Sequence, residues 1–146
     1  MASASAYLST NTDDHQHLEV VGDSIRAAML EHPRNLERIV RLLNLLIRDL
    51  QLHFTIEENY MKDVDYPGLA GHQRSHLFII SELANHVRAV AMDREVADPD
   101  VWTHVKGELR RHMAIFDHDF SGFLERAPLP ALFREAGDET LPTPTP

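Results

Sequence analysis

Four segments of this chain repeat apolar residues with the period of an α-helix, and none alternates as a β-strand does. His32-Pro33 separates the first two segments, and Asp98-Pro99 suits the start of the fourth. Asp13 or Asp14 could cap the first helix. The connections are short, so the pattern favours an all-α, antiparallel up-down four-helix bundle. The predicted helices cover about residues 14–31, 34–64, 67–92 and 98–126.

Composition narrows the class of protein. Residues 1–126 are predicted to form the bundle, and the Pro-rich residues 127–146 a tail or linker. The net charge of -9 argues against nucleic acid and anionic membranes as partners. The absence of cysteine excludes disulfides and thiolate metal sites. No apolar run is long enough to span a bilayer and no signal-peptide pattern stands out, so the expected location is the cytoplasm.

Polar residues stand where leucines would be expected on the inner helix faces. Leu46 and Leu50 begin a stripe that continues with His53 and Glu57, four residues apart on one helix face. Each such pair alone is typical of a solvated helix surface. Together, however, the polar residues interrupt the inner faces of all four predicted helices. The candidates are His17, His53, Glu57, His72, His76, His112 and Asp117.

Burying five imidazoles and two carboxylates without partners would cost several kcal/mol for each charge. Metal ions would satisfy all of these groups at once. Imidazole with carboxylate suits iron, zinc, copper or manganese, and seven ligands exceed the need of one tetrahedral zinc. The sequence therefore favours two cations with bridging carboxylates.

The remaining histidines serve as a comparison. Four of them fall off the inner stripes and are expected to face solvent, and His86 is expected to pack in the core or to support the site. Those four are His15, His32, His104 and His118.

His112 and Asp117 are five residues apart, which places them about 140° from each other on a regular α-helix. If both reach one metal pair, either the helix unwinds locally or the Asp117 side chain reaches round a regular helix. We therefore predict a π-bulge between them, a feature often found at functional sites.

Four short motifs surround the candidate residues. They are Asp14-His15-Gln16-His17, His53-Phe54-Thr55-Ile56-Glu57-Glu58-Asn59-Tyr60-Met61, Tyr66-Pro67 followed by His72 and His76, and His112 to Asp117. Together these motifs resemble those of the hemerythrins, specifically the bacterial hemerythrins, from about Leu8 to Leu124. Their spacings within and between segments all agree with that family.

The resemblance implies two iron ions joined by an oxo or hydroxo bridge, with dioxygen bound at an open position on one of them. His17 and His53 would hold that iron. Leu109 and Met113 would line the open position, where small anions such as azide would compete. Glu58 is expected to support the site or face solvent without ligating. On the other iron the resemblance implies His72, His76 and His112, with Glu57 and Asp117 as bridges.

Three functions fit such a site: oxygen carriage or storage, oxygen or redox sensing in a signalling protein, and reduction of peroxide or nitric oxide. The apolar Leu109 and Met113 favour reversible binding over an enzyme, which would need positioned proton donors. A ferritin-like di-iron oxidase would instead show several glutamates and Glu-x-x-His pairs. The hemerythrins commonly have a tryptophan one turn before the fourth-helix histidine. This chain has Glu108 at that position, so the wall of its pocket is expected to differ from that of the family.

Overall fold

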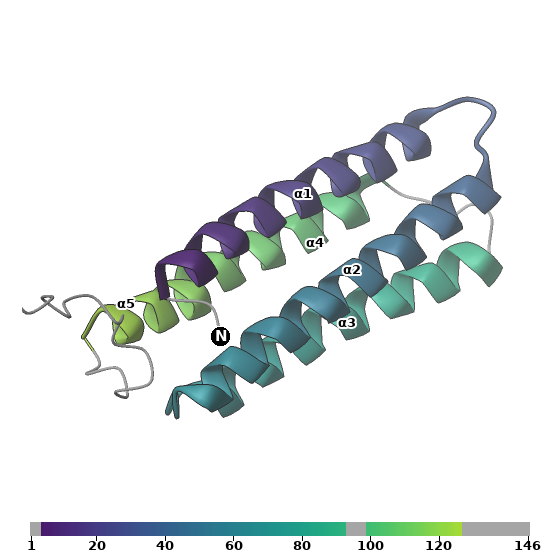
Figure 1. Ribbon diagram of the computed structural model, residues 1–146. Coiled ribbons are helices and arrows are strands. Elements are labelled where there is room, and N and C mark those ends of the chain that lie inside the picture. Colours follow the sequence, from purple (N-terminus) through teal and green to yellow (C-terminus); the bar gives the residue numbers. More distant parts are fainter. Residues whose placement is uncertain (1–3, 93–98, 127–146) are drawn as a thin grey trace, which may run out of the picture.

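The computed structural model describes residues 4–92 and 99–126, and it is all-helical over those residues. Figure 1 shows four long rods side by side, with α1 next to α4 and α2 next to α3. The last rod is α4, η1 and α5 in direct succession. The predicted bundle is confirmed. The elements are α1 (Ala4–Leu30), α2 (Leu36–Asp63), α3 (Leu69–Met92), α4 (Pro99–His112), the π-helix η1 (Met113–Asp117) and α5 (His118–Arg126).

Several helix ends differ from the sequence-based expectation. Helix α1 begins at Ala4, so Asp13 and Asp14 lie inside it and do not cap it. The sequence-based prediction recognises a helix by a periodic stripe of apolar residues. The segment before Asp14 has no such stripe, so the prediction could not extend the helix there. Asn35 caps α2, its side-chain oxygen accepting the Arg38 backbone N–H at 3.0 Å. The expected Asp98 cap and the predicted tail, residues 127–146, lie outside the described residues.

Helices α1 and α4 pack closely where Gly22 meets Trp102. A Cβ atom on this glycine would lie 1.6 Å from Cζ2 of Trp102, so no larger residue fits without moving the ring. Gly22 therefore lies on the buried face of α1. This face reads Leu18, Gly22, Ile25 and Met29.

Two apolar clusters fill the bundle, and the polar candidates lie between them. Along α2, Leu50 and Phe54 belong to the larger cluster and Met61 to the smaller one. Along the fourth rod, Val105 belongs to the larger cluster and Phe120 to the smaller. The core therefore holds a polar layer with apolar packing on both sides. None of the described helices is long and apolar enough to cross a membrane.

Candidate metal centre

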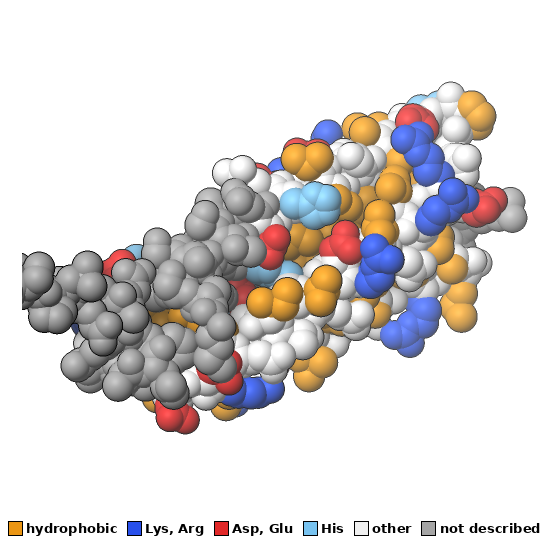
Figure 2. Space-filling view, viewed as in Figure 1, with side chains coloured by type: hydrophobic (Ala, Val, Ile, Leu, Met, Phe, Trp, Pro, Cys, Tyr) orange, Lys and Arg blue, Asp and Glu red, His pale blue; other side chains and the backbone are white. Residues whose placement is uncertain are grey.

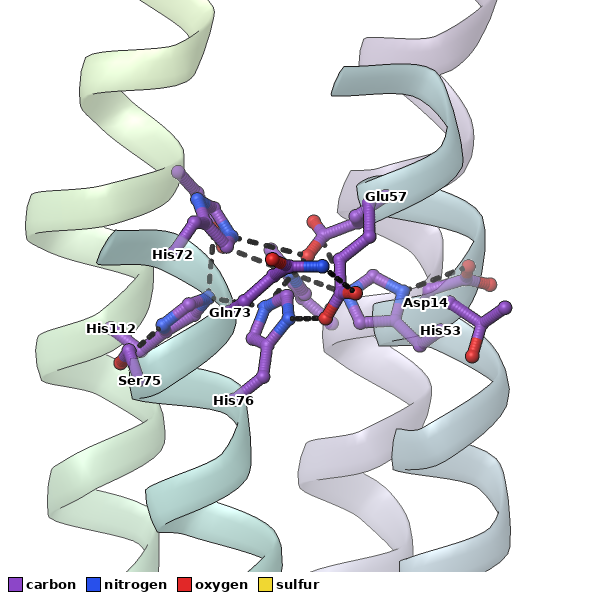
Figure 3. A network of polar contacts seen from close by, with 12 residues as sticks. Asp14, His53, Glu57, His72, Gln73, Ser75, His76 and His112 are labelled. Atoms are coloured by element: carbon purple, nitrogen blue, oxygen red, sulfur yellow. Dashed lines mark hydrogen bonds and ion pairs between the residues drawn. The ribbon is translucent and has the colours of Figure 1, made fainter. Parts of the chain in front are cut away.

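Six of the seven predicted site residues meet in one buried cluster, seen from close by in Figure 3. Each of these side chains belongs to a residue at most 7% exposed. Because α2, α3 and the fourth rod all contribute, the cluster forms only when the bundle closes. The residues are His53 and Glu57 from α2, His72 and His76 from α3, His112 from α4 and Asp117 from η1.

The two carboxylates lie between two groups of histidines. Oδ1 of Asp117 lies 3.1 Å from Nε2 of His72, and Oδ2 lies 3.3 Å from Nε2 of His15. Glu57 divides its oxygens in the same way. Its Oε1 is 3.5 Å from Nε2 of His53, and its Oε2 is 3.2 Å from Nε2 of His76. Each carboxylate thus presents one oxygen to each group.

Two overlapping sets of side chains have ligand atoms close enough to hold a metal ion, and they share Glu57. Three histidines complete one set and two complete the other. A carboxylate common to both sets is the arrangement that a bridged pair of cations requires. The sets are Glu57, His72, His76 and His112, and His15, His53 and Glu57.

The π-helix brings Asp117 to the side of His112, so the predicted π-bulge is confirmed. The His118 backbone N–H reaches back five residues to the carbonyl oxygen of Met113. This wider turn lets Oδ1 of Asp117 come within 2.9 Å of Nε2 of His112.

His17 does not join the cluster. Its side chain is 63% exposed and lies 3.7 Å from Asp49 in a surface groove between α1 and α2. Figure 2 shows this face, with histidine and acidic side chains around a hollow. His15, expected to face solvent, takes the inner position: it precedes Leu18 by three residues on the buried face, and its Nε2 lies 3.1 Å from Nε2 of His53.

The prediction for His17 was wrong because it assigned His17 to the helix face of Val21, and Val21 is only partly buried. The stripe runs instead through Gly22, which an apolar pattern does not count. Extending that stripe back from Leu18 by one turn would have pointed to His15. The other comparison histidines behave as expected: His32, His104 and His118 are exposed and His86 is buried.

The arrangement of the cluster's polar atoms suits the binding of a metal ion better than hydrogen bonding among those atoms. His72 Nε2 and both Asp117 oxygens are buried and form no hydrogen bond of acceptable geometry, although Nε2 and Oδ1 are only 3.1 Å apart. Buried polar atoms at such distances without hydrogen bonding are arranged as ligands around a third atom would be.

The close contacts within the cluster also shift the pKa values of its side chains. Burial lowers the pKa of His72, but contacts with Asp117 and Glu57 outweigh it and raise the pKa to about 9. Burial raises the pKa of Glu57, but contacts with His72 and His76 outweigh it and hold that pKa well below its ordinary value. The carboxylate is therefore ionised at neutral pH and ready to ligate a cation.

Three of the histidines, His53, His76 and His112, also have partners at their outer ring nitrogens, most of which the sequence did not single out. Nδ1 of His53 lies 3.3 Å from Asp14, and Nδ1 of His112 lies 2.8 Å from the Ser75 hydroxyl. Glu58, expected at the margin of the site, contacts His76. Such contacts set which ring nitrogen faces a metal.

A small cavity of about 20 Å³ adjoins His15 and His53. Leu109 and Met113 both line it, and the surface it presents is almost entirely apolar. Its volume accommodates a molecule of about the size of water.

Comparison with known proteins agrees with this geometry. A family model described as the hemerythrin HHE cation binding domain matches residues 8–124. This chain belongs to the hemerythrin family. Hemerythrin domains bind a di-iron centre, and the buried histidine–carboxylate cluster of this member is able to hold metal.

Two curated relatives of this hemerythrin-family chain are similar to it. Both are named bacteriohemerythrin and come from two strains of Campylobacter jejuni, serotypes O:6 and O:2. Each is 35% identical over 80 residues, which is 52% of this chain. The chain spans 59% of the length of these relatives. No solved structure is significantly similar to the chain.

Proposed function

We propose that this protein binds dioxygen reversibly at a non-haem di-iron centre. The ligands in this proposal are His15 and His53 for one iron, and His72, His76 and His112 for the other. Glu57 and Asp117 would be shared by both. Two ferrous ions held there would supply the electrons and the open coordination position that dioxygen needs.

The observation that carries the proposal is the place of the cavity. It adjoins both histidines of the smaller set, His15 and His53, but only His112 of the larger set. The smaller set has one imidazole fewer than the other. A vacancy for a small ligand is expected on that side.

The chain's own residues suit binding better than turnover. Leu18, Leu109 and Met113 line the cavity and keep bulk water away from the centre. Glu19, Lys106 and Arg110 also line it, but the cavity surface is almost entirely apolar. Few groups are thus placed to deliver protons, which an enzyme reducing peroxide or nitric oxide would need.

The test starts from protein loaded with Fe²⁺ under anaerobic conditions. On exposure to air its visible spectrum should change, with about one dioxygen taken up per iron pair, and the change should reverse under vacuum. Azide should compete for the oxidised site. Continuous consumption of oxygen with an added reductant would replace the binding function with an enzymatic one.

Carriage or storage differs from sensing in its effect on conformation. A sensor must change shape between its reduced and oxidised forms. Limited proteolysis that is identical in both forms supports carriage or storage, and a state-dependent pattern supports sensing.

A further inference from the structure

Glu58 follows the shared carboxylate Glu57 on α2 but points to the groove between α2 and α3. Its Oε1 lies 2.9 Å from Nδ1 of His76, and its Oε2 accepts a hydrogen bond from the Gln73 amide at 2.8 Å. The Glu58 side chain is 21% exposed, so water screens these contacts only in part. The Gln73 amide thus holds the Glu58 carboxylate against the outer nitrogen of a candidate ligand.

His76 is held more firmly than the neighbouring histidines. The ring of Phe54 stacks on it with centroids 3.7 Å apart and 9° between planes. The outer nitrogen of His53 faces Asp14, whose side chain is 43% exposed, at the longer distance of 3.3 Å. The outer nitrogen of His112 meets only a neutral hydroxyl. The three rings therefore differ in how much negative charge supports them.

We propose that Glu58, held in place by Gln73, is a positioning residue that orients His76 and increases its basicity as a metal ligand. This rests on the proposed di-iron centre. With Nδ1–H donating to Glu58, Nε2 carries the lone pair and faces Glu57 and the site. The charge of the carboxylate makes the ring a stronger donor, which stabilises the oxidised metal ions relative to the reduced ones.

A surface ion pair would look similar in a contact list but would behave differently. Glu37 and Arg41, also on α2, form such a pair at 3.1 Å, with the Glu37 side chain 87% exposed. Removing a solvent-exposed pair of this kind changes little. Glu37 is therefore a matched control on the same helix.

The experiment compares Glu58→Leu, Glu58→Gln, Gln73→Leu and Glu37→Leu. Fe²⁺ affinity is measured anaerobically by competition with a chelator, and the midpoint potential by redox titration. Glu58→Leu should bind Fe²⁺ about 10- to 100-fold more weakly, and Gln73→Leu should show a smaller loss. Glu58→Gln keeps an acceptor for Nδ1–H but loses the charge, so it should keep most of the affinity while its midpoint potential rises.

The proposal is overturned if Glu58→Leu binds Fe²⁺ as tightly as Glu37→Leu, or if the potential of Glu58→Gln equals that of the unmodified protein. Should Glu58→Leu fail to fold, the potential of Glu58→Gln decides. Neither measurement involves oxygen. A protein that shows these effects but binds no dioxygen would refute the proposed function and keep this role for Glu58.

Discussion

His112 Nε2 and Asp117 Oδ1 lie 2.9 Å apart although the two residues are five positions apart in the chain. The π-helix η1 makes this possible by holding one residue more than a regular turn. If that residue is left out, the inward positions before and after η1 fall into one continuous α-helical stripe. The π-helix thus corresponds to one residue inserted into a regular α-helix, and both His112 and Asp117 still face the site.

Deleting Ala114, an exposed residue of η1, should therefore be tolerated. His112 and Asp117 would then be four apart on a regular α-helix and would still share a face. Iron content should stay unchanged, and the thermal midpoint should rise because the backbone hydrogen bonds become regular. Elemental analysis and calorimetry measure the two effects.

Inserting one alanine after Ala114 is the matched control. The insertion turns Asp117 by about 100° away from its present direction, so iron should be lost. The account of η1 fails if the deletion strips the metal or if the insertion keeps it.

His15→Ala and His17→Ala differ in their expected effect on metal. His15 lies 3.3 Å from Asp117 and 3.1 Å from His53, whereas His17 reaches only Asp49 on the surface. Iron content should fall from about two ions per chain to about one in His15→Ala and stay at two in His17→Ala. The reverse pattern would restore the sequence-based assignment of His17.

Much of this site followed from the sequence because its residues interrupt apolar stripes that are otherwise regular. Glu57 continues a leucine stripe, and its buried position needed no structure to predict. His15 was misplaced because its stripe passes through Gly22, which packs against Trp102 but is not counted as an apolar residue. The contact is between distant parts of the chain, and local periodicity contains no trace of it.

The partners of the outer ring nitrogens were out of reach for the same reason. Asp14 meets His53 from another helix, and Ser75 likewise meets His112. Short polar residues on a helix give no periodic signal that separates these contacts from ordinary surface positions. Only the packing of the four helices brings them together.

Metal uptake should release a proton from His72. Its pKa of about 9 in the metal-free protein, against an ordinary 6.5, means that His72 is protonated at neutral pH. The proton must leave before Nε2 can bind a cation, so the apparent affinity should rise with pH, about tenfold per unit between about pH 7 and pH 8. Above a pH of about 9 the rise should level off. Zn²⁺ titrations in weakly buffered solution with an indicator dye measure the released proton. An affinity that is independent of pH would contradict the assigned charge state.

Leu109 should control access to the cavity. Because the cavity is only about 20 Å³, Leu109→Phe should fill it and slow azide binding to the oxidised protein. Leu109→Asn should admit water and speed the irreversible oxidation of the irons in air. Leu77 is 67% exposed on α3, and Leu77→Asn is the control that should change neither rate. Stopped-flow absorbance would measure both, and equal rates in all variants would place ligand entry elsewhere.

The central claim is that two metal ions share Glu57 and Asp117 within this bundle. Anomalous diffraction at the iron edge, from crystals of the iron-loaded protein, tests it most directly. We expect two iron peaks, both in contact with the two carboxylates, with His15 and His53 beside one peak and His72, His76 and His112 beside the other. A single peak, or a peak contacted by His17 in place of His15, would contradict it.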